Sequence, residues 1–210
     1  MCKRVSLLVL VALLACVPAF GGVGIFGDTD DIGAVGGYGV TTTVAGSGYY
    51  EIIAGGSDIW GTADQFHFAY NQVTGNVRFE LSNPMWEIAG DYWAKIETML
   101  RVDTSTGSIA YATATRRGNR DTKVVPPVPV HDWVGAQIRS VANAGMWGGV
   151  EWGGRVPSKI ATQRIVSGDY QLVQALVDFG AGAGWENLDT RVVPGLPDQL
   201  LLGAAVTSHN

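Results

Sequence analysis

The chain has 210 residues, of which 47% are hydrophobic, 16% are charged and 29 are glycines, and its formal net charge is −5. This composition excludes disorder, which needs low hydrophobicity and high charge, and disfavours a helical bundle, because so many glycines break helices. An acidic chain gains nothing from releasing phosphate counterions, so no nucleic-acid partner is expected.

The first 19 residues have the pattern of a secretory signal peptide. Two basic residues precede eleven apolar ones (Ser6–Cys16), and small residues stand at the −3 and −1 positions of a cleavage site after Ala19. Eleven apolar residues are too short for the ~30 Å hydrocarbon core of a membrane, so no membrane span is expected. The alternative is a lipoprotein whose first residue is a lipidated Cys16. Both interpretations predict export, to the periplasm, the cell surface or the medium.

The remainder, residues 20–210, is expected to form one domain without a disulfide. Both cysteines of the chain lie in the leader, at positions 2 and 16, so the domain also lacks a thiolate metal site and a cysteine nucleophile. Loss of Lys3 and Arg4 brings the formal net charge of the mature chain to −7. That charge disfavours anionic membrane surfaces and polyanions as partners.

Alternating and β-branched residues predict strands along the whole domain, separated by turns. The predicted strands are Val40–Val44, Gln65–Tyr70, Asn76–Leu81, Ala94–Val102, Ser108–Thr115, Gln137–Val141, Ile160–Val166, Gln171–Phe179 and Leu200–Val206. We expect two hairpins, one through the turn at 73–76 and one through the polar loop at 103–107. Strict alternation places Val77, Phe79 and Leu81 on one face. Residues Gly118–Pro129, rich in proline and basic residues, are expected to form a long exposed loop.

Several short sequence motifs resemble those of a known family. They are GSDIWGTADQFHFAY at 56–70, WAK at 93–95, GWE at 184–186 and GAAVTSHN at 203–210. In this order they resemble the concanavalin A-like (laminin G-like) lectin/glucanase β-sandwich domains of exported bacterial proteins, over about 180 residues. Two departures from the family pattern stand out. In the strand that contains residues 95–101, Glu97 stands where family members have a small residue. Family members also continue past the motif at 203–210 into one more strand. Either this sequence is a fragment, or residues near Gly39–Val44 close the sheet alone.

The resemblance implies an all-β fold, a two-sheet antiparallel jelly-roll sandwich with a concave face. It implies no mechanism, because this fold hosts hydrolases, lectins and passive spacers.

No catalytic constellation is evident in the sequence. Glycosidases of this fold class use a Glu-x-Asp-x-x-Glu strand, which is absent. The chain also lacks a Gly-x-Ser-x-Gly elbow and a His-Glu-x-x-His motif. The three histidines, His67, His131 and His209, are interpreted as packed or exposed structural residues.

Calcium is the one metal that the sequence leaves open. Asp28, Asp30 and Asp31 offer hard oxygen ligands in a segment expected to be a flexible loop. The alternative is a solvated acidic turn, and no other cofactor is expected.

Tryptophans are the candidates for ligand contact. Trp147, Trp152 and Trp185 stand among glycines, where loops could present them to a sugar ring. Trp60 and Trp93, within the family words, are expected to pack in the core or at the sandwich rim.

We therefore expect an exported non-catalytic β-sandwich module that binds carbohydrate or another surface polymer, or serves as a structural or interaction domain. The alternative is a glycan-active hydrolase or lyase with unrecognised acids. Two carboxylates roughly 5–10 Å apart on the concave face would favour the enzyme, whereas an exposed tryptophan there without an acid pair would favour binding.

Overall fold

The computed structural model describes residues 7–10, 22–37, 39–86, 93–116, 120–121, 128–129 and 132–209. These residues contain strands and no helix. The strands are β1 (Leu7–Leu10), β2 (Asp28–Ile32), β3 (Val40–Val44), β4 (Tyr49–Ile53), β5 (Phe66–Val73), β6 (Val77–Trp86), β7 (Lys95–Arg101), β8 (Ala110–Arg116), β9 (Arg120–Asp121), β10 (Val128–Pro129), β11 (Trp133–Arg139), β12 (Trp147–Gly153), β13 (Lys159–Ser167), β14 (Tyr170–Asp178), β15 (Glu186–Val192) and β16 (Leu200–Thr207).

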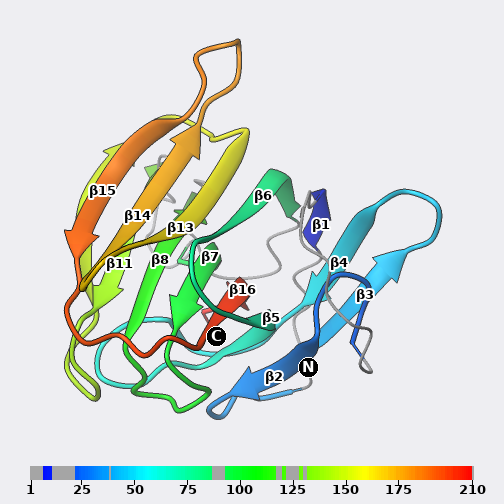
Figure 1. The fold of residues 1–210 in the computed structure, drawn as a ribbon. Coiled ribbons are helices and arrows are strands. Elements are labelled where there is room, and N and C mark those ends of the chain that lie inside the picture. The colour runs from blue at the N-terminus through cyan, green and yellow to red at the C-terminus, as the bar shows by residue number, and fades with distance from the viewer. Residues whose placement is uncertain are drawn as a thin grey trace.

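Two seven-stranded sheets make up the fold, and neighbouring strands in both are antiparallel (Figure 1). Sheet A has the order β15-β14-β13-β6-β1-β4-β3, and sheet B has the order β12-β11-β8-β7-β16-β5-β2. The expectation of an all-β, antiparallel chain is confirmed. No helix with the length and apolarity of a membrane span occurs among the described residues.

The main core lies between the two sheets. Phe79 and Leu81 of β6 are buried against Ile96 and Leu100 of β7, and Val77 packs at the margin of the same cluster. The alternation of β6 therefore places its apolar face as the sequence predicts. Burial of this face on the facing sheet is the main stabilising contribution that the pattern encodes.

Buried threonines bring the middle of the two sheets into direct contact. Thr162 of β13 donates to the Thr98 carbonyl of β7 at 2.7 Å, and Thr113 of β8 donates to the Ala161 carbonyl of β13 at 2.6 Å. Small side chains allow this close approach, and each buried hydroxyl has a partner, as burial requires.

One of the two expected hairpins is present, and the prediction of the other is wrong. β7 and β8 pair in register across the polar loop. β5 and β6, however, belong to different sheets, so the turn at 73–76, with Gly75 at φ 66°, connects the two layers. The physical reason is that β5 is buried on both faces: Phe66 and Phe68 pack on the outer face of sheet B while Ala69 packs in the main core. Such a strand sits inside a sheet between two partners, here β16 and β2.

The segment Gly118–Pro129, expected to be a loop, contains a short antiparallel pair. Val128 and Pro129 of β10 face Asp121 and Arg120 of β9. The proline is tolerated there because a two-stranded pair has only edge strands.

Candidate functional site

A loop of residues 54–65 crosses the outer face of sheet B, the face turned away from sheet A. Its Ile59 is fully buried in a second apolar cluster with Phe66, Phe68 and Met99. The Met146 amide donates to the Gly61 carbonyl at 2.6 Å, which fastens the loop to the segment before β12. The loop thus covers one half of this face with apolar contacts.

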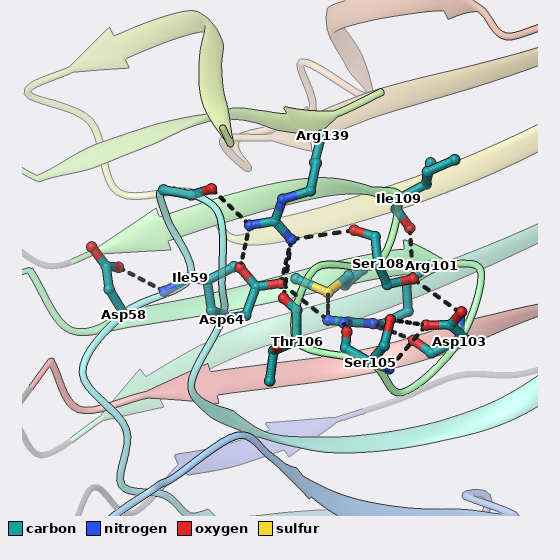
Figure 2. Close-up of polar contacts among 12 residues, drawn as sticks. Asp58, Ile59, Asp64, Arg101, Asp103, Ser105, Thr106, Ser108, Ile109 and Arg139 are labelled. Atoms are coloured by element: carbon teal, nitrogen blue, oxygen red, sulfur yellow. Dashed lines mark hydrogen bonds and ion pairs between the residues drawn. The ribbon is translucent and has the colours of Figure 1, made fainter. Parts of the chain in front are cut away.

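A buried ion cluster anchors the end of this loop (Figure 2). Asp64 accepts two hydrogen bonds of 2.7 Å from the Arg139 guanidinium of β11, one on each oxygen. Arg101 of β7 approaches the same carboxylate at 3.4 Å, and all three side chains are fully buried. Burial lowers the pKa of Arg101, while the charge of Asp64 opposes that shift. The carboxylate therefore compensates two buried cations.

A pocket of about 330 Å³ opens on the other half of the same face. Its lining comes from the loop, from the residues just before β7, from strands β7, β8, β11 and β12 of sheet B, and from the segment after β16. The lining residues are Asp58, Trp60, Trp93, Lys95, Arg116, Trp133, Gln137, Glu151 and His209. A pocket of this size lies near the lower limit of small-ligand sites, which run from about 300 to 1,000 Å³.

Small residues in the sheet make room for this pocket. One row of the register runs across four strands through Glu97, Ala114, Gly135 and Glu151. A Cβ on Gly135 would lie 2.6 Å from the Trp133 ring, so that ring lies across the glycine. A Cβ on the neighbouring Gly148 would likewise meet the Glu151 carboxylate at 2.6 Å.

Aromatic rings line the pocket. Trp60 is 41% exposed and Trp93 is 39% exposed, whereas Trp133 is buried. The Arg116 guanidinium lies 4.0 Å from the Trp93 ring centre, and Lys95 Nζ lies 5.3 Å from that of Trp60. These distances are within the range of cation–π attraction, which holds the rings in place. Neither Trp60 nor Trp93 packs in the core, so of the two expected placements, core or sandwich rim, only the rim agrees with their exposure.

Charged groups at the pocket are paired with one another. Lys95 Nζ donates to Asp58 at 2.6 Å and to the Ile59 carbonyl at 3.2 Å, and His209 Nε2 lies 3.5 Å from the other Asp58 oxygen. Burial raises the pKa of Asp58, but the hydrogen bond from His209 and the charge of Lys95 outweigh it, so that the pKa is lowered. Asp58 is thus held ionised.

Glu97 is fully buried beside the pocket. In the amide orientation that gives both its atoms a partner, Gln137 donates to Glu97 Oε1 at 2.6 Å and accepts from Lys95 Nζ at 3.2 Å. Glu97 Oε2 has no hydrogen-bond partner among the described residues. Burial raises the pKa of Glu97 to about 8, with Lys95 opposing the shift. The carboxyl is therefore largely neutral at pH 7 and can act as a hydrogen-bond donor.

The tryptophans that the sequence singled out lie elsewhere. Trp147 and Trp152 are in strand β12, not in a loop, and Trp185 directly precedes β15. Trp152 stacks on Phe179 with ring centres 5.8 Å apart, and Trp185 lies under the Arg78 guanidinium at 4.0 Å. None of the three lines the 330 Å³ pocket.

The three aspartates proposed for calcium do not lie in a flexible loop, and that expectation is wrong. They belong to β2, the edge strand of sheet B. Asp30 accepts from the Tyr70 hydroxyl at 2.7 Å, whereas Asp31 contacts His67 Nδ1 at 2.8 Å. Asp28 and Asp30 share one face of the strand and Asp31 takes the other, because side chains alternate. Among the described residues no group of three metal-binding side chains converges.

His67 occupies an acid–imidazole–hydroxyl arrangement. Its Nδ1 contacts Asp31, and its Nε2 lies 2.9 Å from the Thr41 hydroxyl of β3. Thr41 is buried, and the Gly39 backbone packs directly against the imidazole. A substrate therefore has no access to the hydroxyl, and the arrangement ties β3 to the edge of sheet B. The expectation of a packed His67 is confirmed, while His131 lies outside the described residues.

Three residues of this region were not predicted as site residues from the sequence: Trp60, Trp93 and Glu97. A signal for Glu97 was present: Lys95, Glu97 and Arg101 stand at alternate positions, and so on one face, of a strand that is otherwise mostly apolar. Its neighbours are the alanine-rich β8 and β16, which contains Gly203 and two alanines. Charged residues on one face of a central strand indicate a buried polar site.

Known proteins do not assign this chain to a family. Neither a protein-family model nor a curated protein matches it. A solved structure of a functionally unknown protein from Saccharomyces cerevisiae is similar with a TM-score of 0.45 and 11% sequence identity, covering 80% of this chain and 81% of that one.

Proposed function

We propose that this protein is an exported, non-catalytic module of the concanavalin A-like, jelly-roll type that binds carbohydrate in the pocket on the outer face of sheet B. The leader sequence supports export, and the sequence words together with two facing antiparallel sheets support the fold type. The observation that carries the binding proposal is the pair of partly exposed tryptophans, Trp60 and Trp93, in one pocket with ionised and amide groups.

The chemistry of the pocket suits a sugar. An aromatic face contacts the C–H groups of a pyranose, and carboxylate, amide and ammonium groups fix its hydroxyls. Here Trp60 and Trp93 supply the faces, and Asp58, Glu151 and Gln137 supply polar atoms. Because Lys95 is neutralised by Asp58, the pocket does not demand a charged ligand.

A glycan array with the mature protein, with and without EDTA, identifies the sugar. Calorimetry with the best glycan then compares Trp60→Ala and Trp93→Ala with Trp147→Ala and Trp185→Ala. We expect the first pair to weaken binding by at least roughly two- to twelve-fold, since an aromatic contact contributes about 0.5–1.5 kcal/mol beyond its buried area. Loss of binding only in the second pair would show that the ligand sits on the tryptophans outside the pocket. A loss on EDTA treatment would reopen the calcium hypothesis.

A glycan-active enzyme is the second candidate, and Glu97 is the observation that favours it. A carboxyl that keeps its proton at neutral pH can serve as a general acid. Glu97 itself is buried and reaches the pocket through Gln137, which lines it together with the ionised Asp58. Release of reducing ends from an array-positive polysaccharide, abolished in Glu97→Gln with binding retained, would establish catalysis. Binding without turnover in the wild type favours the module.

The lipid anchor is tested separately by mass spectrometry of the mature N-terminus. A diacylglyceryl Cys16 would show a lipoprotein, and a free Phe20 would show signal peptidase cleavage after Ala19.

A further inference from the structure

One inner strand of sheet A, β1, belongs to the predicted leader. β1 pairs antiparallel with β4 on one side and with β6 on the other (Figure 1). Leu8 faces Glu51 of β4 and Met85 of β6. Cleavage after Ala19 removes these residues, and so does processing at Cys16. Either route of export therefore takes an inner strand out of a seven-stranded sheet and separates β15-β14-β13-β6 from β4-β3.

Removal of β1 leaves a slot between β4 and β6. Adjacent strands lie about 4.8 Å apart, so two strands that flank a missing one are separated by roughly 10 Å. Both walls then present backbone N–H and C=O groups without partners, and such edges attract an added strand.

Contacts beneath the slot hold both walls apart. Phe26 packs edge-on against Tyr50 of β4, with ring centres 5.1 Å apart, and against Phe79 of β6 at 5.9 Å. The Tyr50 hydroxyl also accepts a hydrogen bond from the Ile25 amide at 2.8 Å. Ile52 of β4 is buried in the same core as Phe79. None of these contacts involves β1, so they remain to position both walls when it leaves.

We propose that the slot between β4 and β6 of the exported protein is a docking site for an extended apolar strand of a partner polypeptide, which enters antiparallel to both walls. The proposal rests on the predicted removal of the leader and is independent of the carbohydrate pocket in sheet B. The segment that occupies the slot in the full chain, Leu7-Leu8-Val9-Leu10, shows the chemistry that fits. Only an extended backbone can form hydrogen bonds with the N–H and C=O groups of β4 and β6 at the same time. An apolar strand suits this site because the sheet packs on the core.

A second copy of the chain is the less suitable occupant. Each strand of the described mature part is already paired within a sheet, so a copy would have to break its own pairing to donate one. A partner with an unpaired apolar segment has no such cost.

Hydrogen exchange tests the proposal on two forms of the protein. One is the exported protein purified from secreting cells, with its N-terminus checked by mass spectrometry, and the other is the full chain made without export. The probe is a synthetic peptide of residues Lys3–Ala12, which carries its own two basic residues. The matched control is the same peptide with Val9→Pro, because proline removes a ladder donor and disfavours a central strand. Residues 171–177 of β14 serve as internal reference.

We expect the β4 amides directed at β1, and the amides of residues 82–86 in β6, to exchange at least about ten-fold faster in the exported protein than in the full chain. The β4 amides directed at β3 should keep their protection. The probe, but not its proline control, should restore protection to the first group. The proposal is overturned if the exported protein retains the leader, or if the amides of β4 and β6 that are directed at β1 in the full chain are already protected without the probe. It is overturned equally if the probe fails to slow exchange, or if protection grows with protein concentration as a dimer forms.

Discussion

Replacing Asp64 with asparagine is the sharpest test of how the pocket is built. The change keeps the shape of the side chain and removes the one carboxylate that faces both Arg139 and Arg101. Two guanidinium groups without any solvent exposure then lose their compensating charge. Arg139 keeps its hydrogen bonds to backbone carbonyls, among them those of Gly61 and Ser108, but a carbonyl oxygen does not carry a full negative charge.

The magnitude follows from this burial. Removing one partner of a buried ion pair costs about 3–5 kcal/mol, because an uncompensated charge stays in the interior. Domains of this size unfold with about 5–15 kcal/mol in total. We therefore expect Asp64→Asn to lose about 3 kcal/mol, since asparagine retains one acceptor oxygen, and to loosen the loop of residues 54–65.

Urea denaturation, followed by tryptophan fluorescence, measures the change as a shift of the midpoint at constant slope. Glu80→Gln is the matched control, because Glu80 pairs with Arg78 at 2.7 Å and both side chains are 28% exposed. A pair of that kind contributes about 0.2–1 kcal/mol. If Asp64→Asn costs no more than this control, the reasoning that the buried cluster fastens the loop is refuted.

Three further predictions concern the pocket and the core. Burial raises the pKa of Glu97 from 4.5 to about 8, so in this window the folded state holds a proton that the unfolded chain releases. The free energy of unfolding should therefore fall as the pH rises through this window and level off above it, and Glu97→Gln should lose this pH dependence. Urea titrations at several pH values measure it. Gly135→Ala should push the Trp133 ring into the pocket and weaken glycan binding in calorimetry, whereas Gly153→Ala should bind as the wild type does, because its Cβ would meet only the Asp132 carbonyl, at an ordinary contact distance of 3.9 Å. Thr162→Val should lower the free energy of unfolding by about 1–3 kcal/mol, because the Thr98 carbonyl between the sheets would lose its hydrogen bond while staying buried. The control Thr190→Val, at an exposed position, should change it by less than about 0.5 kcal/mol. Equal effects of the two substitutions would contradict the threonine contact.

Strand positions could be predicted from the sequence because alternation directly reports a half-buried sheet. β6 shows this well: Phe79 and Leu81 face the core as their spacing requires. The partner of β5 could not be predicted in that way. A strand apolar on both faces carries no periodic signal for its neighbours, and its pairing with β16 depends on a segment about 130 residues later in the chain.

The site was harder to predict for a related reason. Glycine-rich surroundings pointed to Trp147 and Trp152, but glycines in β12 make room for the Glu151 carboxylate rather than form a loop. Trp60 and Trp93 come together only after the loop of residues 54–65 folds over sheet B, an arrangement set by tertiary contacts far apart in sequence. Local pattern contains no information on such convergence, whereas the charged face of β7 does mark the sheet that carries the pocket.

The loop of residues 54–65 is fastened at two points, the Gly61 carbonyl and the Asp64 carboxylate. This has a consequence for the rate at which a ligand binds. A wall that already stands in place requires no gating step before a ligand enters. Mixing experiments should then give single-exponential association whose observed rate rises linearly with ligand concentration, without the plateau that a slow opening step imposes.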